Sequence, residues 1–397
     1  MLTMIHANGA RIEGGVFKVD RKFHVGMQSF ISRIGTQILS MHPESLPGTQ
    51  VMDPVEIPLE QLGYRVITVK TDRMGRPLPN ELGRLRDQIA QSRLLYDGGN
   101  LGSGKLARSL GVPYIQIIEY DLPTHITVAT TEVSNVLRRG VRAARCVMKY
   151  ATSTIPDMRG AHSLHCNGYP VYDESSRFNS HRLLYLDSRM SADLVIPEDR
   201  LRLRLSGRAG RRLRLLYSGR YEPLKGADHA VRVAIECIKR GLSVELHCYG
   251  QGSLRAEMER LAAQAMVGDS LIRIHHAIPY PELVDISRTF DLFVCCHIQS
   301  DPSCTYLESF GAGLPIVGYG NRMWRRLSEE SRVGFWSPLG QPQAVADDVQ
   351  KLAADFETLA AMSERARRFA IEHTFEREFK RRTDALNDAL ERSPGRE

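Results

Sequence analysis

Short apolar runs alternate with amphipathic segments along the second half of the chain. Runs of strand length and composition lie at Leu213–Tyr217, Ser243–Tyr249 and Ile272–His275. Between them, Ala227–Lys239 and Leu254–Ala265 carry apolar residues at the spacing of a helix that buries one face. Strands and helices that alternate in this way predict a doubly wound α/β domain built on a parallel sheet.

The stretch 291–321 continues this alternation and contains the most informative loop. An apolar strand, Leu292–Cys296, is followed by a polar turn, Gln299–Ser303, then by the helical segment Thr305–Phe310 and a second strand, Leu314–Tyr319. In open α/β sheets, ligands bind in the loops that follow parallel strands. Backbone N–H groups at the helix start suit an anionic ligand that carries hydroxyl groups, such as a nucleotide sugar.

The first half shows a similar but less regular pattern. A short strand is expected at Val16–Val19, a helix at Met27–Leu39, and an irregular, proline-rich insertion at 41–61. The elements expected after the insertion are Tyr64–Lys70, Leu82–Gln91, Leu94–Tyr96, Leu106–Leu110, Tyr114–Tyr120 and the long helix Val133–Met148. This alternation predicts a second α/β domain.

Composition is consistent with a soluble protein of two domains. Hydrophobic residues make up 42% and charged residues 25% of the 397 residues, a length that suits two domains of about 200 residues each. The net charge of +7 has two open interpretations. The basic residues form an ordinary solvated surface, or they attract phosphate-bearing ligands or an anionic membrane face.

Cysteine usage and the absence of targeting segments indicate the compartment. The seven cysteines include no C-x-x-C pair, so we expect reduced thiols and no zinc site. The N-terminus has no basic region followed by an apolar one, and no apolar run is long enough to cross a bilayer. We therefore expect a cytoplasmic protein, with peripheral contact at the inner face of the membrane as an open alternative.

Two further patterns, a glycine-rich stretch and an arginine-rich segment, are interpreted without a catalytic role. Gly99–Lys105 matches the phosphate-loop pattern G-x-x-x-x-G-K, but Leu106 stands where a Ser or Thr would hold magnesium. A substrate-facing glycine loop or a simple strand–helix turn is therefore favoured over an NTPase. Seven arginines between Arg200 and Arg214 are interpreted as a solvated domain linker, and the absence of interleaved aromatic residues argues against a nucleic-acid partner.

Arg220 and Lys225 lie five residues apart on a predicted strand-to-helix turn. Helix N-terminal amides already favour an anion there, and a planar guanidinium with an ammonium can neutralise a diphosphate. Where a nucleoside diphosphate is the leaving group, such cations stabilise negative charge that grows in the transition state.

Several of these segments together resemble glycosyltransferase family 4, the retaining glycosyl transferases group 1 of the GT-B fold. The segments on which this resemblance rests are SGRYEPLKG (218–226), YGQGSL (249–254), DLFVCCHIQSDPSCTYLESFGAGLPIVGY (291–319) and VGFWSPLGQPQAVADDVQKLA (333–353). The resemblance covers residues 213–385, and in the first half it rests on the alternation and on LGVPYIQIIEY (110–120).

The resemblance implies roles for named residues. Arg220 and Lys225 hold the donor diphosphate, Glu308 binds the ribose hydroxyls, and the turns around Gly219 and Gly250 belong to the donor site. The backbone of Ser303, Cys304 and Thr305 is expected to lie against the phosphate and the sugar.

Two positions depart from the family pattern. The first of two family glutamates, eight positions before Glu308, falls on Ser300, and the adjacent Asp301 is the alternative carboxylate. The family histidine near the reacting carbon has no direct counterpart, which leaves Glu119 or His125 for that role.

The implied protein has two Rossmann-like, doubly wound domains facing across a cleft. An acceptor-binding domain is expected over 1–205, a donor-binding domain over 206–375, and a helix at 376–397 that packs back on the first domain. The implied activity is metal-free, retaining transfer from a nucleotide-diphospho-sugar to a saccharide or lipid-linked acceptor in polysaccharide or glycoconjugate biosynthesis. A nucleotide-sugar epimerase and a non-catalytic donor-binding scaffold remain alternatives.

Overall fold

The computed structural model describes residues 1–45, 53–72, 75–99, 101–207, 210–265 and 271–393 of the chain. Its internal contacts divide the chain into two compact units. Unit 1 comprises Met1–Leu122, Ala144–Tyr185 and Glu376–Glu397, and unit 2 comprises Pro123–Ala143 and Leu186–Phe375. Each unit is described by itself.

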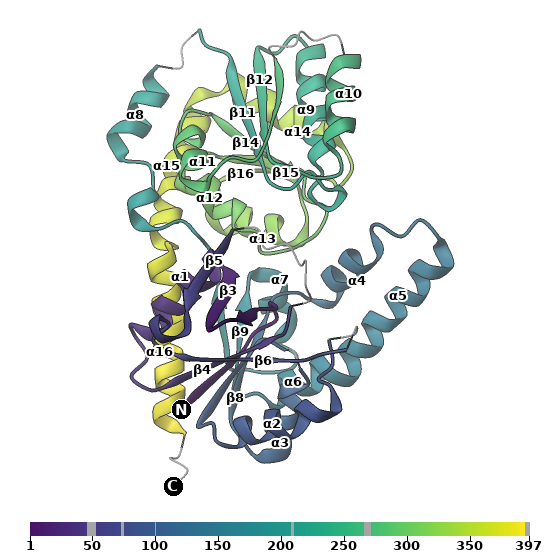
Figure 1. Ribbon diagram of the computed structural model, residues 1–397. Helices are drawn as coiled ribbons and strands as arrows, with labels where there is room; N and C mark the ends of the chain where they lie inside the picture. Colours follow the sequence, from purple (N-terminus) through teal and green to yellow (C-terminus); the bar gives the residue numbers. More distant parts are fainter. Residues whose placement is uncertain (46–52, 73–74, 100, 208–209, 266–270, 394–397) are drawn as a thin grey trace. The chain divides into compact units, whose positions relative to one another are not determined.

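In the described part of unit 1, a sheet of parallel strands has the order β10-β9-β8-β7-β1-β4-β6 (Figure 1). The strands are β1 (Leu2–Ile5), β4 (Ile38–Pro43), β6 (Arg65–Val69), β7 (Leu94–Asp97), β8 (Tyr114–Ile118), β9 (Ser163–Asn167) and β10 (Arg182–Tyr185). Every residue of β1 and β7 is buried, as expected for central strands covered on both faces.

The expected helix at Met27–Leu39 was wrong in its bounds. Helix α1 spans Arg21–Ile31 and begins at Asp20, whose carboxylate accepts a 2.9 Å hydrogen bond from the backbone N–H of Lys22. Residues from Ile38 onward form β4, which pairs with β1 and β6. Strand pairing in the centre of the sheet decided the conformation of an apolar segment whose spacing also fitted a helix.

The segment 41–61 is also more regular than expected where it is described. Strand β5 (Pro54–Pro58) pairs antiparallel with β3 (Val16–Asp20), which pairs in turn with β2 (Arg11–Glu13). Prolines stand at both ends of β5, and this strand is an edge strand of the small sheet, where missing N–H donors are tolerated. Residues 46–52 of the expected insertion lie outside the described residues.

The remaining helices belong to unit 1, apart from α4, which lies almost entirely in unit 2, and α5, which the division between the units crosses. They are η1 (Leu59–Gln61), α2 (Pro79–Ala90), α3 (Ser103–Leu110), α4 (Leu122–Thr130), α5 (Val136–Lys149), α6 (Ile155–Gly160), α7 (Tyr169–Ser175) and α16 (Phe375–Arg392). The π-helical turn η2 (Tyr150–Thr154) joins α5 to α6, and the division of contacts falls inside α5.

Helix α16 contributes a buried cation to unit 1. The guanidinium of Arg382 donates two hydrogen bonds, of 3.1 and 3.0 Å, to the hydroxyl of Tyr96 on β7. The same guanidinium lies 4.3 Å from the ring centroid of Tyr185 and 5.0 Å from that of Phe379. Hydrogen bonds and cation–π contacts of this kind compensate for the burial of the charge.

Unit 2 contains a parallel sheet of order β13-β12-β11-β14-β15-β16 among its described residues. The strands are β11 (Leu213–Ser218), β12 (Val244–Tyr249), β13 (Ile272–His275), β14 (Leu292–Cys295), β15 (Ile316–Tyr319) and β16 (Gly334–Ser337). The helices are η3 (Ala192–Leu194), α8 (Glu198–Ser206), η4 (Pro223–Lys225), α9 (Ala227–Lys239), α10 (Arg255–Gln264), α11 (Tyr280–Ser287), α12 (Thr305–Gly311), α13 (Arg322–Ser331), α14 (Pro342–Ala354) and α15 (Phe356–Glu372). This is a doubly wound α/β arrangement, as the alternation of apolar runs predicts.

The arginine-rich segment expected to be a solvated linker includes helix α8, which makes contacts in unit 2. Arg204 on α8 donates hydrogen bonds of 2.8 and 2.6 Å to the backbone carbonyls of Ala312 and Gly313. Burial lowers the pKa of Arg204 to about 10. The longer segment of unit 2 begins at Leu186, ahead of the boundary expected after residue 205.

Across the described chain, no helix combines the length and the hydropathy needed to cross a bilayer.

Candidate functional site

The candidate site of unit 2 lies where the order of its strands reverses. Strand β11 pairs with β12 on one side and with β14 on the other, all in parallel. The chain leaves β11 into the loop 219–226 and leaves β14 into the loop 296–304. Such a switch point is where open α/β sheets bind ligands, at the carboxyl ends of the strands.

Glycines allow the loops at this edge to approach one another. A Cβ atom on Gly250 would lie 1.9 Å from the carbonyl oxygen of Gly219. Gly226 has a φ of +57°, and a Cβ there would lie 2.2 Å from the carbonyl oxygen of Cys296. Any other residue at these two positions would push the loops apart, since both distances are far below van der Waals contact.

Lys225 and Asp301 bring the two loops together as an ion pair. The distance from Lys225 Nζ to Asp301 Oδ2 is 2.6 Å, and both side chains are largely buried. The loops are also joined through their backbones, because the N–H of Ile298 donates a 3.0 Å hydrogen bond to the carbonyl of Leu224. The structure therefore places a buried ammonium at the switch point, paired with a carboxylate from the loop that follows the adjacent strand β14.

A buried histidine that is not among the predicted site residues lies beside this pair. His297 is 1% exposed, and its Nδ1 is 3.9 Å from Asp301 Oδ1. Burial, together with the charge of Lys225, lowers the pKa of His297 to about 3, so the ring is neutral. Within the described chain, neither ring nitrogen of His297 nor Oδ1 of Asp301 has a hydrogen-bond partner. In the sequence, the position of His297 just after an apolar strand was the signal that could have indicated this residue.

Arg220 lies on the same loop as Lys225 but in a different environment. Its side chain is exposed, and it forms no ion pair with any residue that the structure describes. The hydroxyl of Tyr217 donates a 2.9 Å hydrogen bond to the carbonyl of Arg220, which fixes the backbone at this point. The guanidinium is thus available to an anion from solvent, whereas the ammonium of Lys225 is already paired.

Glu308 on α12 pairs with an arginine that the sequence analysis did not single out. Arg189 donates to Glu308 Oε1 from Nε at 2.9 Å and from Nη2 at 2.8 Å. The guanidinium of Arg189 also lies 4.2 Å from the ring centroid of Tyr280. No local pattern indicates this pairing, because 119 residues separate the two partners. A ligand hydroxyl that reaches Glu308 would share or replace this contact.

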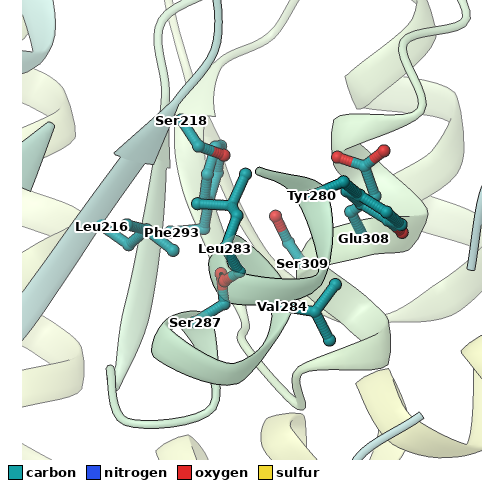
Figure 2. A pocket seen from close by; sticks show the side chains of 9 residues that line it. All are labelled: Leu216, Ser218, Tyr280, Leu283, Val284, Ser287, Phe293, Glu308 and Ser309. Carbon is teal, nitrogen blue, oxygen red and sulfur yellow. Dashed lines mark hydrogen bonds between the residues drawn. The ribbon is translucent and has the colours of Figure 1, made fainter. Parts of the chain in front are cut away.

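Glu308 lines a pocket whose residues come from β11, α11, β14 and α12, shown in Figure 2. Aliphatic and aromatic side chains form most of its wall, while Ser218 at the end of β11 and the carboxylate of Glu308 supply polar groups. Its lining residues are Leu216, Ser218, Tyr280, Leu283, Val284, Ser287, Phe293, Glu308 and Ser309. The pocket has room for about one water molecule, so it lies beside Glu308 without forming a ligand site by itself.

The loop residues predicted to contact the donor have local partners. The hydroxyl of Ser300 accepts a 3.0 Å hydrogen bond from the backbone N–H of Arg322 at the start of α13. The hydroxyl of Ser303 donates to that of Thr305 at 3.1 Å, and Cys304 Sγ lies 3.9 Å from Asp187 Oδ2. Ser300 therefore has a capping role, and Asp301 is the carboxylate that this loop presents beside Lys225.

The corresponding edge of the sheet in unit 1 is rich in neutral imidazoles. His6, which follows β1, stacks on His42 of β4 with ring centroids 4.6 Å apart. His165 Nδ1 lies 3.0 Å from the hydroxyl of Tyr96. Burial lowers the pKa of His42 to about 4 and that of His165 to about 3. At the end of β7, burial raises the pKa of Asp97 to about 6.

The two candidates for a residue near the reacting carbon lie in different units. Glu119 is exposed and directly follows β8 in unit 1, and His125 is exposed on α4, in a segment assigned to unit 2. The role of either residue stays a prediction.

The glycine-rich stretch 99–105 has structural reasons for its composition. The hydroxyl of Ser103 donates a 2.6 Å hydrogen bond to Asp97, and a Cβ on Gly104 would lie 2.7 Å from the carboxyl carbon of Asp157. Gly99 and Gly102 have φ angles of +76° and +68°. These contacts favour a strand–helix turn, with Asn100 outside the described residues.

Solved structures similar to this chain define its fold. The Anabaena protein HepE, solved in complex with UDP, matches 98% of this chain and 99% of its own with a TM-score of 0.65 at 13% identity. WaaG, described as a glycosyltransferase involved in lipopolysaccharide biosynthesis, matches 97% and 99% with a TM-score of 0.64 at 14% identity. The two parallel-sheet units of this chain have the GT-B fold of such glycosyltransferases.

Sequence comparisons point to the same class of protein. The model of the family "Glycosyl transferases group 1" matches residues 204–369, so this region of the chain is similar to that family. A curated relative, the alpha-D-kanosaminyltransferase of Streptomyces kanamyceticus, is 25% identical over 268 residues. The match spans 66% of the length of each protein, just under two thirds.

Proposed function

We propose that this protein is a retaining glycosyltransferase that moves a sugar from a nucleoside-diphospho-sugar to an acceptor hydroxyl. The observation that carries the proposal is the buried Lys225–Asp301 pair at the switch point of unit 2, with Arg220 on the same loop. Complexes of HepE with UDP and with UDP-glucose support a uridine nucleotide as the first donor to test.

In this proposal, the cations act on the leaving group. The bond between the anomeric carbon and the diphosphate oxygen breaks, an oxocarbenium-like centre forms, and the acceptor oxygen bonds to the same face of the sugar. The acceptor proton passes to the departing phosphate. Lys225 and Arg220 stabilise the negative charge on the diphosphate, so the proposal includes no metal ion.

Glu308 and Asp301 have separate roles in this proposal. Glu308 accepts hydrogen bonds from the ribose hydroxyls, each such charge-assisted bond being worth about 1.5–3 kcal/mol. Asp301 orients the ammonium of Lys225, which is 2.6 Å away. The acceptor is proposed to be a saccharide or a lipid-linked saccharide bound by unit 1, with Glu119 or His125 near the reacting carbon. A role in polysaccharide or glycoconjugate synthesis follows from this acceptor class.

The test is an assay of the purified full chain with a panel of nucleotide sugars, with and without saccharide acceptors. We expect transfer that depends on the acceptor and retains the anomeric configuration by NMR. Lys225→Ala should abolish transfer, while Lys239→Ala, at the other end of α9, should leave it unchanged. Conversion of the nucleotide sugar without an acceptor would indicate an epimerase, and donor binding without any turnover would indicate a scaffold; both results would contradict the proposal.

A further inference from the structure

Helix α5 presents almost its entire surface to solvent. Of its 14 residues from Val136 to Lys149, all are exposed except Ala143 and Cys146, which are half-buried. Figure 1 shows α5 as a long helix that runs on into α6. A helix of a globular protein normally buries an apolar stripe against its own core, whereas none of the residues that the structure describes covers the stripe of α5.

The exposed apolar side chains of α5 lie on one face. Leu137 is 81% exposed, Val136 76%, Met148 66%, Val141 52% and Val147 45%. At about 100° per residue, these five positions fall within an arc of roughly 140° on the helix surface. Isolated exposed hydrophobic residues are common on proteins, but a contiguous face of them marks an interaction surface.

The opposite face of α5 carries all the charged residues of the helix, and all of them are basic. Its charged residues are Arg138, Arg139, Arg142, Arg145 and Lys149. No Asp or Glu occurs between Glu132 and Asp157. By the same helical geometry, Arg139 and Arg145 stand at the two borders of the apolar arc. Long arginine side chains at such borders keep their charge at a polar interface while the apolar face is buried.

We propose that α5 binds the surface of an anionic phospholipid membrane, with its apolar face in the lipid interface and its cations at the lipid headgroups. A large apolar face opposed by a basic face is typical of helices that lie in the plane of a membrane. The apolar face carries aliphatic side chains without a single Tyr, Trp or Phe, whereas protein interfaces are enriched in aromatic residues. The unbroken positive charge complements a surface that is uniformly negative.

Charge sets the expected strength of this binding. A cation near an anionic lipid surface contributes a factor of about five in binding, so replacing three arginines weakens it about a hundredfold. Each exposed Leu or Met that enters the interface contributes about tenfold or more. Because the basic face and the apolar face each contribute to membrane binding, mutations in one face should weaken binding without changing the other face.

The test is sedimentation of the purified full chain with vesicles. Wild type should bind vesicles of phosphatidylglycerol and phosphatidylcholine, and bind vesicles of pure phosphatidylcholine far more weakly. The triple variant Arg138→Gln, Arg139→Gln, Arg145→Gln should lose about a hundredfold in partition, and Leu137→Ser with Met148→Ser a similar factor. Because these side chains are exposed, both variants should keep the circular dichroism and the nucleotide binding of wild type.

Matched controls come from α8 and from Arg212, which follows it in the chain. Leu203 is 71% exposed, so Leu203→Ser removes an exposed apolar side chain outside α5. Arg200→Gln, Arg202→Gln and Arg212→Gln together remove the same charge as the α5 triple variant. Both controls should partition within about twofold of wild type, since the residues lie outside the proposed surface.

Three results would overturn the proposal. The first is wild type that fails to sediment with anionic vesicles. The second is equal binding of wild type and the α5 variants. The third is self-association of wild type, measured by light scattering, that Leu137→Ser abolishes while vesicle binding is absent, which would assign the face to a second copy of the chain. Nucleotide binding and transfer assays are independent of all three outcomes.

Discussion

The carboxyl ends of the two parallel sheets carry different chemistry. In unit 2, the switch point holds the buried pair Lys225–Asp301, with the exposed guanidinium of Arg220 nearby in sequence. In unit 1, the equivalent edge holds the stacked rings of His6 and His42 and a carboxyl group whose pKa is raised by burial. The first arrangement favours a multiply charged anion, and the second favours uncharged polar groups.

This difference shows what topology does and does not determine. A parallel sheet determines where a ligand is expected, at the ends of its strands near a switch point. The residues in the loops determine which ligand gains free energy there. In the proposed enzyme, unit 2 binds the nucleoside diphosphate and unit 1 binds an acceptor hydroxyl, so their sites can be perturbed separately.

The largest effect is expected from Lys225. Lys225→Ala leaves Asp301 buried without its partner and removes a cation from the proposed diphosphate site, so affinity for UDP should fall about a hundredfold or more. Calorimetric titration measures this loss. The double variant Lys225→Met, Asp301→Asn removes both charges together and should regain stability without regaining affinity. Regained affinity would show that the pair only supports the fold.

The next effect concerns Glu308. Glu308→Gln should weaken binding of UDP by about 10- to 100-fold, because a charge-assisted hydrogen bond to the ribose is lost. The same substitution should change little with 2′,3′-dideoxyuridine diphosphate, which lacks the hydroxyls. Glu329→Gln, on the exposed side of α13, is the matched control. An equal loss with both nucleotides would assign Glu308 a structural role through Arg189.

The pH dependence of stability tests the edge of unit 1. The pKa of His165 is about 3 in the folded protein and about 6.5 when unfolded, so below pH 6.5 the unfolded chain binds a proton that the folded chain does not. The free energy of unfolding should therefore fall as pH falls from 6.5 toward 3, by about 1.4 kcal/mol per pH unit for this histidine. His165→Asn should reduce the slope by that amount in denaturant titrations and leave UDP binding at pH 7 unchanged. An unchanged slope would show that His165 is accessible to protons.

The smallest effect is expected from Ser300. Its hydroxyl accepts a hydrogen bond from the N–H of Arg322, so Ser300→Ala should lower stability by about 1 kcal/mol through loss of a helix cap. Affinity for UDP should stay within about twofold of wild type. A loss of UDP affinity larger than the loss of stability would give Ser300 a direct role in the donor site.

Local patterns predicted unit 2 better than unit 1. The expected helix Ala227–Lys239 has the same bounds in the structure, because its apolar spacing and the glycine at each end agree. Strand β1 was missed, and the helix predicted at Met27–Leu39 overlaps strand β4. Short apolar runs fit both the helical and the strand periodicity, and pairing within the sheet decides between them. The strands β9 and β10 were also missed.

The candidate site, too, could be predicted from the sequence only in part. Lys225 could be named from its strand-to-helix turn, and Asp301 and Glu308 from the family resemblance of the segment 291–319. The partners of Glu308 and the neutral state of His297 could not, because they depend on contacts over long sequence distances and on burial. Pairing across the fold is a property of the tertiary structure.

The most direct test of the central claim is a crystal structure of the full chain with UDP. We expect the diphosphate within hydrogen-bond distance of Lys225 Nζ and the guanidinium of Arg220, with the ribose hydroxyls at Glu308. Nucleotide bound instead at the glycine-rich turn 99–105 of unit 1, with the Lys225–Asp301 loop empty, would contradict it.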